Sequence, residues 1–428
     1  MLPGLVLAAV LALVAVPRAD AASKGPCIAG TKRPTCYFWK GKVTFVADGD
    51  TIDVNVYGDG TSTPIRVRMT GINAMEQHRY SHDPAKRTGD CHALEATARL
   101  EDLIRRGHGV VRLAAQDPKS RSGVRYRRSV AVYLNGAWRD TGQILIDEGH
   151  VLWLPNSIES AHNRRYNRGA QRAAAASRRL WDPEYCGSGP DQEARLRMWV
   201  NWDADGTDGG SHLNGEWVKI KNVGSTDLPI GGWWFRDSFL IRYTFPARAV
   251  IPAGRSIRLY VGSRPSRDTN TTTHFYWGRT SPIFDNVRSG RGMGDGGYLF
   301  DPDGDLRLAM MYPCRYSCSD PARGKIAVTA RRSAPEKVYA RNVSGSRVNL
   351  EGYVVESYPY VYSFGPRTFL APGEKLNLVV IGSTARDTRL VKHWGKKRYI
   401  LNDSGDEVLL RTETNIRIGC YAWGSRAC

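Results

Sequence analysis

The chain has 428 residues, of which 41% are hydrophobic and 24% are charged, a composition typical of folded domains rather than of disordered or collagen-like chains. Lysine and arginine number 61 against 42 acidic residues, and the resulting formal net charge of +19 favours a polyanionic partner. The only sustained apolar run lies within the first sixteen residues, which excludes a bundle of transmembrane helices.

This apolar run predicts a secretory signal peptide over residues 1–21. Residues 5–16 consist only of Leu, Val and Ala and are too few to span a bilayer comfortably. Pro17 ends the run, and Ala19 and Ala21 place small residues at the two positions that a signal peptidase reads. No Lys or Arg precedes the run, so a membrane anchor is the alternative. We expect a secreted, extracellular protein whose mature form has no transmembrane segment.

The cysteines agree with export. Their number is even and they form no Cys-x-x-Cys pair, which favours disulfide bonds in an oxidising compartment over zinc ligation. The eight are Cys27, Cys36, Cys91, Cys186, Cys314, Cys318, Cys420 and Cys428.

Residues 37–186 form a first block, in which strands precede helices. Segments rich in β-branched residues are separated by Gly- and Asp-rich turns. Leu94, Leu100 and Leu103 lie largely on one face of a predicted helix that ends at Gly107. This order of elements predicts a small β-barrel with helices packed on it. The other expected elements are strands at 42–46, 51–57, 65–69 and 130–134 and helices at 143–148 and 161–180.

After a linker at residues 187–190, the sequence predicts many short strands and no amphipathic helix. An internal repeat is visible in this region. Asn222 and Gly232 recur at equal spacing as Asn342 and Gly352, and a Tyr-x-Phe motif and a Trp-Gly pair recur in the same order. We therefore expect two similar all-β domains.

Several charged side chains of the first block have the chemistry to act on a phosphodiester. Asp48 and Asp50 lie at a turn that enters a strand, and paired carboxylates suit a hard cation with oxygen ligands. Glu76 follows another strand and can remove a proton from water. Arg68 and the arginine pair at 127–128 can hold a phosphate group through forked hydrogen bonds. Each feature alone is common in turns and on surfaces, but their combination predicts a metal-assisted phosphodiesterase.

Residues 38–186 resemble the staphylococcal nuclease (thermonuclease) family. The resemblance implies an α+β fold, in which a five-stranded OB-fold barrel carries three helices. It also implies calcium-dependent hydrolysis of DNA and RNA to 3′-phosphate products. Five segments match in the family's order: VADGDT at 46–51, RMTGINAME at 68–76, YRRSVA at 126–131, ILIDEG at 144–149 and SRRLW at 177–181.

The same resemblance assigns three catalytic residues. Arg68 lies eight residues before Glu76, the spacing between the family's first catalytic arginine and its catalytic glutamate. Arg128 matches the second catalytic arginine by the Tyr-x-Arg pattern, whereas counting back from Tyr133 favours Arg127. We take Arg68, Glu76 and Arg128 as the catalytic set and keep Arg127 as the alternative.

The resemblance also implies a Ca²⁺ site formed by Asp50, Asn73 and Ala74, with Asp50 as the principal ligand. Asn73 stands where the family has a second aspartate, which removes one negative charge from the site. Met75 replaces the proline before the catalytic glutamate, which loosens the turn that directs Glu76. We expect an active domain with altered metal affinity, which either needs more calcium or accepts another divalent cation such as Mg²⁺ or Mn²⁺.

The two β-repeats resemble lamin-tail domains, which are immunoglobulin-like sandwiches. The first repeat, at residues 194–318, carries the resemblance at 214–222 and 228–233, and the second, at 325–428, carries it at 401–408. This family supplies no catalytic residues, so we expect these domains to contact the cell envelope or another polyanion.

Two further patterns are more typical of structure than of ligand binding. The Asp-rich segments at 203–206 and 301–305 lack the glycine spacing of a helix-flanked calcium loop, which favours turns. Trp233 and Trp234 are expected to fill the core of the first sandwich.

We also expect disulfide bonds between Cys91 and Cys186 and between Cys420 and Cys428.

Together these features predict a secreted, sugar-nonspecific endonuclease that uses calcium and acts on DNA and RNA. The alternative is a non-catalytic protein that binds nucleic acid or the cell envelope through an inactive nuclease-like barrel, because OB folds often bind strands without chemistry. The retention of Glu76 and of the arginines favours the enzyme.

Overall fold

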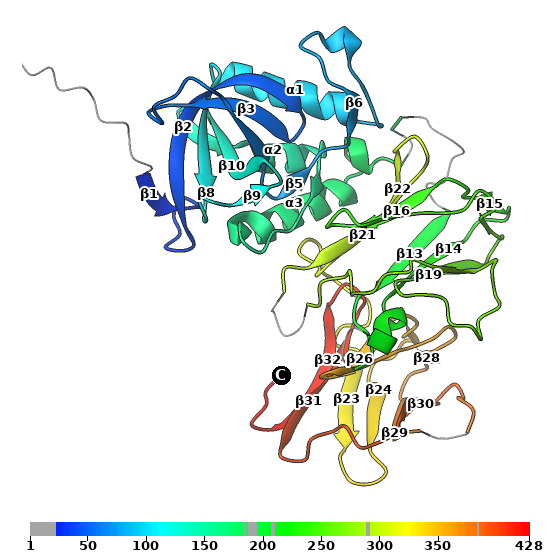
Figure 1. Cartoon of the computed structure of the whole chain (residues 1–428). Coiled ribbons are helices and arrows are strands. Elements are labelled where there is room, and N and C mark those ends of the chain that lie inside the picture. Colours follow the sequence, from blue (N-terminus) through cyan, green and yellow to red (C-terminus); the bar gives the residue numbers. More distant parts are fainter. Residues whose placement is uncertain (1–22, 184, 187–194, 207–209, 288–291, 383–384) are drawn as a thin grey trace, which may run out of the picture.

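A computed structural model describes residues 23–183, 185–186, 195–206, 210–287, 292–382 and 385–428. The expected signal peptide and the expected linker at 187–190 lie outside the described residues. The described chain is mostly β-structure with three α-helices, and it forms three successive parts (Figure 1). We refer to residues 23–186, 195–318 and 325–428 as the N-terminal, middle and C-terminal parts.

The N-terminal part contains twelve of the described strands. They are β1 (Ser23–Pro26), β2 (Thr35–Asp48), β3 (Thr51–Val56), β4 (Ile65–Met69), β5 (Ile72–Asn73), β6 (Gln77–Arg79), β7 (Thr88–Gly89), β8 (Val110–Ala115), β9 (Arg121–Ser122), β10 (Arg125–Leu134), β11 (Ala137–Asp140) and β12 (Leu152–Trp153). Five of them pair in a cycle: β2 with β3, β3 with β4, β4 with β10, β10 with β8, and β8 again with β2. The β4–β10 pair is parallel and the other four pairs are antiparallel.

The three helices are α1 (Ala93–Arg106), α2 (Thr141–Glu148) and α3 (Asn163–Ala175). Helices α1 and α2 pack on this sheet, and α3 packs against α2 and β12. Leu100 and Leu103 of α1 are buried at helical spacing, as predicted, whereas Leu94 is exposed. A side-chain oxygen of Asp140 accepts a hydrogen bond from the Gln143 backbone amide and so caps the start of α2.

The helix expected over residues 161–180 is wrong at its C-terminal end. After α3 the backbone adopts positive φ values of 44° at Ser177 and 48° at Arg179, which end regular helix. A 3₁₀ turn then carries Trp181 into the core. The 3₁₀ helices are η1 (Pro84–Lys86), η2 (Ser160–His162), η3 (Arg179–Trp181) and, in the middle part, η4 (Gly210–Gly215).

The middle and C-terminal parts have the same strand order. The middle part contains β13 (Leu196–Asn201), β14 (Trp217–Asn222), β15 (Leu228–Pro229), β16 (Trp234–Asp237), β17 (Arg242–Thr244), β18 (Val250–Ile251), β19 (Ser256–Tyr260), β20 (His274–Tyr276), β21 (Asp295–Phe300) and β22 (Leu306–Tyr312). The C-terminal part contains β23 (Ile326–Arg331), β24 (Lys337–Asn342), β25 (Val348–Asn349), β26 (Val354–Ser357), β27 (Tyr360–Ser363), β28 (Phe369–Leu370), β29 (Lys375–Ile381), β30 (Val391–Lys396), β31 (Gly405–Arg411) and β32 (Arg417–Gly424). Sheets β13-β14-β19-β20 and β17-β16-β21-β22 correspond to sheets β23-β24-β29-β30 and β27-β26-β31-β32.

The internal repeat also extends to individual hydrogen bonds. The side-chain amide of Asn222 donates to the carbonyl oxygens of Thr226 and Ile251. That of Asn342 donates in the same way to the carbonyl oxygens of Ser346 and Leu370. The repeated asparagines therefore do the same structural work in both copies, since each satisfies two backbone groups.

All eight cysteines form disulfide bonds, and both pairs expected from the sequence are confirmed. The four bonds are Cys27–Cys36, Cys91–Cys186, Cys314–Cys318 and Cys420–Cys428. Among the described residues, none of the helices has both the length and the apolar character that crossing a bilayer requires.

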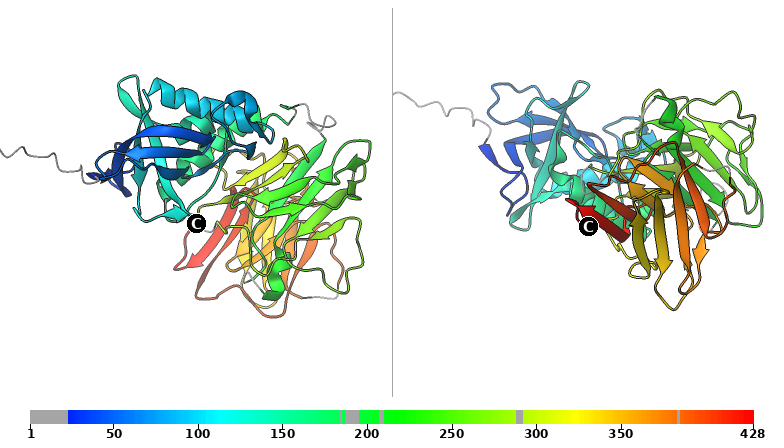
Figure 2. Two further views of the ribbon diagram at one scale, coloured as in Figure 1. Left: turned by 45° about the horizontal axis from the view of Figure 1, so that its top comes forward. Right: turned by 90° about the horizontal axis from the view of Figure 1, so that it is seen from below.

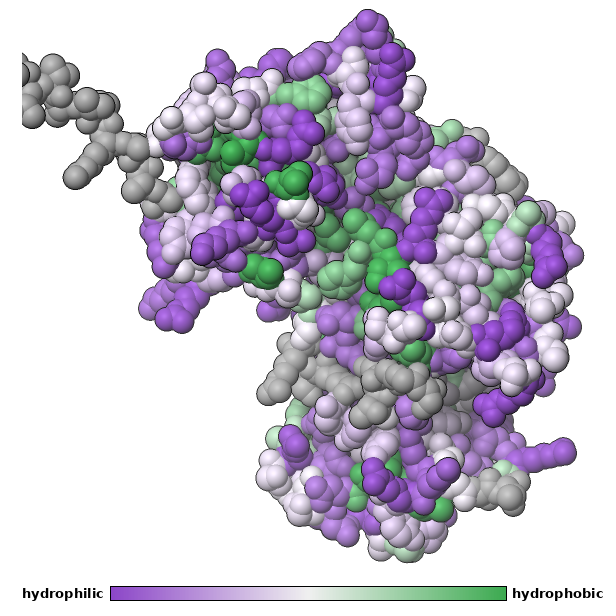
Figure 3. Space-filling model, viewed as in Figure 1, coloured by the Kyte–Doolittle hydropathy of each residue, from purple (hydrophilic) through white to green (hydrophobic). Residues whose placement is uncertain are grey.

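One face of the β16–β21–β22 sheet packs against the N-terminal part (Figure 2). Because side chains alternate along a strand, Phe235 lies in the core of the middle part, whereas Trp234, Tyr298 and Phe300 join the core of the N-terminal part. The ring centroids of Tyr298 and Trp181 are 6.3 Å apart. Apolar side chains are also visible on the surface where these two parts meet (Figure 3). The expectation that Trp234 fills the sandwich core is therefore wrong, because its strand position turns it outward.

Polar contacts reinforce this interface. The Cys91 backbone amide donates to the Asp303 carbonyl oxygen at 3.1 Å. The side-chain amide of Gln171, on α3, donates to the Pro313 carbonyl oxygen at 2.8 Å and accepts from the Arg315 backbone amide at 2.7 Å. The middle part is consequently held in one position on the N-terminal part.

The histidine pair at the start of α1 leads to a prediction about acid stability. His92 and His150 are buried with ring nitrogens 3.1 Å apart, and burial lowers their pKa values to about 3 and about 4. In the unfolded chain both titrate near pH 6.5, so between that pH and the folded pKa values the unfolded state binds more protons. From pH 8 to pH 5, the free energy of unfolding should therefore fall by about 2 kcal/mol for each histidine.

Urea unfolding at pH 8 and pH 5 measures this difference. His150→Gln, which removes one of the two groups, should reduce the acid-induced loss relative to the unmodified chain. An equal loss in both proteins would show that the pair does not control acid stability.

Candidate active site

The turn between β2 and β3 buries two carboxylates side by side. An Asp48 side-chain oxygen accepts a hydrogen bond from the Asp50 backbone amide at 2.9 Å, which closes an Asx-type turn. At the intervening Gly49, a Cβ atom would lie 2.7 Å from the Cβ of Ala96 and 2.8 Å from that of Ala74. Only glycine fits this contact, so the turn packs tightly against α1 and both acids point into the protein.

The Asp50 carboxylate contacts three other residues of the site. Its Oδ1 lies 2.7 Å from Nη1 of Arg68 and accepts a hydrogen bond from the Thr51 hydroxyl at 3.0 Å. Its Oδ2 accepts a hydrogen bond from the Ala74 backbone amide at 2.8 Å. These contacts bring together three segments of the sequence: the turn that enters β3, the end of β4 and the chain after β5.

The electrostatics of this group favour an added positive charge. Burial raises the pKa of Asp50 to about 8, and the neighbouring Asp48 also raises it, while the Arg68 guanidinium and the Ala74 amide act in the opposite direction. Arg68 alone therefore does not compensate two buried carboxylates. A cation bound between their oxygens would stabilise the charged form of Asp50.

Glu76 lies beside this turn and is exposed to solvent. Its neighbours fix the backbone, since Met75 is buried in the core and the Gln77 side chain donates to the Thr97 hydroxyl at 2.6 Å. The Glu76 carbonyl oxygen also accepts a hydrogen bond from the Asp90 amide. The backbone at Glu76 is thus held by a buried side chain on each side.

A cleft of about 480 Å³ brings together two of the three catalytic candidates. Arg68 and Glu76 line it, together with Arg125 and Arg127. The parallel pairing of β4 with β10 sets Arg127 directly opposite Arg68. Asp50 lies behind the cleft, joined to it through its ion pair with Arg68.

Arg128 does not line this cleft. Its side chain is buried and donates to the carbonyl oxygens of Arg127 and Pro118, each at 2.7 Å, while the guanidinium covers the Trp39 ring. The reason is strand alternation, which turns consecutive residues of β10 to opposite faces. The geometry therefore favours Arg127, the alternative obtained by counting from Tyr133, over Arg128 as the partner of Arg68.

The residues expected to hold a metal ion have a donor set that fits a hard cation. Asp48 and Asp50 supply carboxylate oxygens, and Asn73 and Ala74 follow in the segment that touches Asp50. Asn73 is buried, and its side-chain Nδ2 has no hydrogen-bond partner among the described residues. The amide nitrogen is a hydrogen-bond donor and cannot ligate a cation, so Asn73 could contribute to such a site only through its Oδ1.

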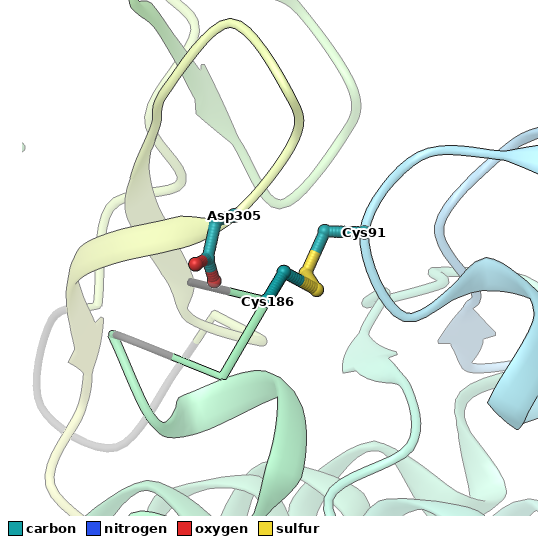
Figure 4. Close-up of side chains that lie close together, drawn as sticks. All are labelled: Cys91, Cys186 and Asp305. Atoms are coloured by element: carbon teal, nitrogen blue, oxygen red, sulfur yellow. A yellow bond between two sulfur atoms is a disulfide. The ribbon is translucent and has the colours of Figure 1, made fainter. Parts of the chain in front are cut away.

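Elsewhere in the described chain, Cys91, Cys186 and Asp305 bring ligand-type atoms within 4.8 Å of one another (Figure 4). The two sulfur atoms are bonded to each other, so they are not available as thiolate ligands. The group is instead a disulfide of the N-terminal part that lies against a carboxylate of the middle part.

Asp301 is a turn residue, as expected from the sequence, because its side chain accepts hydrogen bonds from the Asp303 and Asp305 backbone amides.

The middle part, with its paired four-stranded sheets, can be compared with known families. Residues 200–313 match the lamin tail domain family. This immunoglobulin-like domain lies within the 194–318 range expected from the sequence. A search of curated proteins found no match to the chain.

The lamin tail domain also reaches the candidate active site. Phe239 and Leu240, in the turn between β16 and β17, line the same cleft as Arg68, Glu76 and Arg127. The residues of this turn were not expected in the site, because nothing in a single sequence indicates which domains touch. Arg125 was also missed, although it could have been found, since it lies two positions before Arg127 on the same strand face.

Proposed function

We propose that the chain is a secreted, metal-assisted endonuclease whose N-terminal part is a staphylococcal nuclease-like OB-fold barrel. The closed cycle of pairings from β2 through β3, β4, β10 and β8 supports the barrel. The observation that carries the function is the shared cleft, in which three arginine side chains and one solvent-accessible carboxylate lie next to a buried carboxylate pair. This is the combination needed to bind and hydrolyse a phosphodiester.

In the proposed reaction, Glu76 removes a proton from a water molecule as the water oxygen attacks phosphorus. The bond from phosphorus to the 5′ oxygen breaks, which leaves a 3′-phosphate and a 5′ hydroxyl that takes its proton from solvent. Arg68 and Arg127 hold the phosphoryl oxygens by forked hydrogen bonds and offset their growing negative charge. Asp50, Asn73 and Ala74 would hold a calcium ion, which supplies additional positive charge at the phosphate.

Further features support an extracellular setting. All eight cysteines are paired, and disulfide-rich chains are typical of oxidising compartments. We propose that the C-terminal part is a second lamin-tail-like domain, because its strand order repeats that of the lamin tail domain. The net charge of +19 suits DNA or RNA as substrate and contact of these domains with a polyanion such as the cell envelope.

The second candidate is a protein that binds nucleic acid without cleaving it. The 2.7 Å pair between Arg68 and Asp50 favours this candidate, because it engages one arginine of the clamp inside the protein. Plasmid digestion by the full chain, with calcium and with a chelator, separates the two. Calcium-dependent cleavage supports the nuclease, whereas retained binding without cleavage under any divalent cation supports the binding protein.

The neutral residue at position 73 leads to a prediction about metal affinity. Asn73→Asp restores a carboxylate to the site and should lower the calcium concentration for half-maximal activity roughly tenfold, about 1.4 kcal/mol. Without calcium the added buried charge should lower the melting temperature, and calcium should restore it. Activity and melting temperature measured against free calcium test both effects. Superimposable curves for the two proteins would show that residue 73 does not contact the ion.

A further inference from the structure

The turn between β16 and β17, residues 238–241, places two apolar side chains in the candidate catalytic cleft. We propose that this turn of the lamin tail domain is a wall of the cleft, and that Phe239 stacks on an unpaired nucleobase of the substrate. The proposal rests on the proposed nuclease function and adds a substrate-positioning residue from a second domain.

The turn is rigid although its tip is exposed. An Asp237 side-chain oxygen accepts a hydrogen bond from the Ile241 amide at 2.7 Å, and Asp295 accepts from the Ser238 amide at 2.8 Å. Ser238 is buried, yet Phe239 and Leu240 are 37% and 41% exposed. Two carboxylates therefore fix the base of the turn and leave its apolar tip facing the cleft.

The backbone at the tip is also unusual. Leu240 has φ of 73°, a left-handed conformation that a leucine adopts rarely and at an energetic cost. Strained residues of this kind persist where the surrounding structure holds them, and they are concentrated at binding sites. The hydrogen bonds at the base of the turn hold this conformation.

The strand that leads to the turn anchors it to the N-terminal part. Trp234 stacks on Phe300 at 4.0 Å between ring centroids, and both rings are buried in the core of the N-terminal part. The cleft therefore has walls from two domains whose relative position is set by packing. A base that enters it meets Phe239 at a fixed place relative to Arg68 and Arg127.

Arg236 adds positive charge at this wall. It is buried, its Nε has no hydrogen-bond partner among the described residues, and its guanidinium lies near the Tyr298 and Phe300 rings. Burial lowers the pKa of Arg236 to about 10, with smaller effects from charges that include Glu76 and Arg68, so the group remains charged at neutral pH. The positive potential it adds favours a phosphate in the cleft.

The expected substrate follows from this chemistry. Arginines hold the backbone phosphate without regard to sequence, and an aromatic ring accepts the face of any base. The faces of bases in a duplex are already stacked on their neighbours, so only an unpaired base can use Phe239. The cleft should therefore select single strands or frayed positions.

The test compares cleavage of one oligonucleotide as a single strand and as a duplex by the full chain. Phe239→Ala should raise KM for the single strand about tenfold, because one base–aromatic contact is lost. Its kcat on the duplex should not change. Phe239→Tyr keeps the ring and should behave as the unmodified protein. Val343→Ala, at an exposed apolar residue of the C-terminal part, is the matched control.

Binding of the single strand and of the duplex, measured by fluorescence anisotropy, separates the base contact of Phe239 from the nuclease activity. If all variants cleave with the same ratio of the KM for the single strand to the KM for the duplex, Phe239 has no role in binding, and the nuclease proposal is unaffected. If the unmodified chain cleaves neither substrate, the nuclease proposal fails. Weaker single-strand binding by Phe239→Ala alone would then still support the base contact, and unchanged binding would refute it.

Discussion

Glu76→Gln is expected to reduce turnover of DNA by about 10²–10⁴ while leaving DNA binding nearly unchanged. Glutamine has the size of glutamate and can hydrogen bond, but it cannot accept the proton of the attacking water. Glu76 is exposed at the cleft, and its neighbours Met75 and Gln77 hold the backbone, so the substitution should not disturb the fold. Initial rates at saturating calcium and anisotropy with a labelled oligonucleotide measure the two quantities.

Glu95→Gln provides the matched control, because Glu95 is an exposed glutamate of the same part of the chain and lies on α1 outside the cleft. This variant should retain full activity. If Glu76→Gln were as active as the control, Glu76 could not be the general base, and the proposed reaction would be wrong.

The two neighbouring arginines of β10 should separate catalysis from stability. Arg127→Ala is expected to lower kcat by about 10²–10³ with little change in melting temperature, because its side chain lines the cleft and makes no hydrogen bond to the described residues. Arg128→Ala should instead lower the free energy of unfolding by about 2–3 kcal/mol, because it leaves two carbonyl oxygens without their donor.

Rates at saturating substrate and urea unfolding curves for both variants test this separation. The opposite result, a stable but inactive Arg128→Ala and an active Arg127→Ala, would restore Arg128 to the catalytic role. Loss of both properties in both variants would indicate that the local strand pairing, and not either guanidinium, controls the site.

Arg127 and Arg128 show a limit of prediction from sequence. The Tyr-x-Arg pattern and the distance to Tyr133 gave two answers that differ by one residue. On a strand, that difference sends the side chain to the opposite face. The pairing of Arg127 with Arg68 favours Arg127, and it depends on the register of β10 against a strand that is distant in the chain. Local sequence contains no information on that register.

Other features could be read from the sequence because their causes are local. The α1 face with Leu100 and Leu103, the turn at Asp48 and Asp50, and the internal repeat all follow from spacing and turn chemistry. The end of α3 could not be predicted from the sequence, because it depends on positive φ values near Ser177. The outward orientation of Trp234 likewise depends on a partner domain that its own sequence does not reveal.

The apolar outer face of the lamin tail domain makes it difficult to transfer this domain to another protein. Domains of this kind are usually pictured as modules that recombination can move from one chain to another. Here Trp234, Tyr298 and Phe300 are covered only because Trp181 and its neighbours lie against them. Transplanted alone, the domain would expose these rings to water and tend to aggregate. A replacement with polar residues on that face would in turn expose Trp181 to water, so a substitution on either side of the interface affects the stability of both domains.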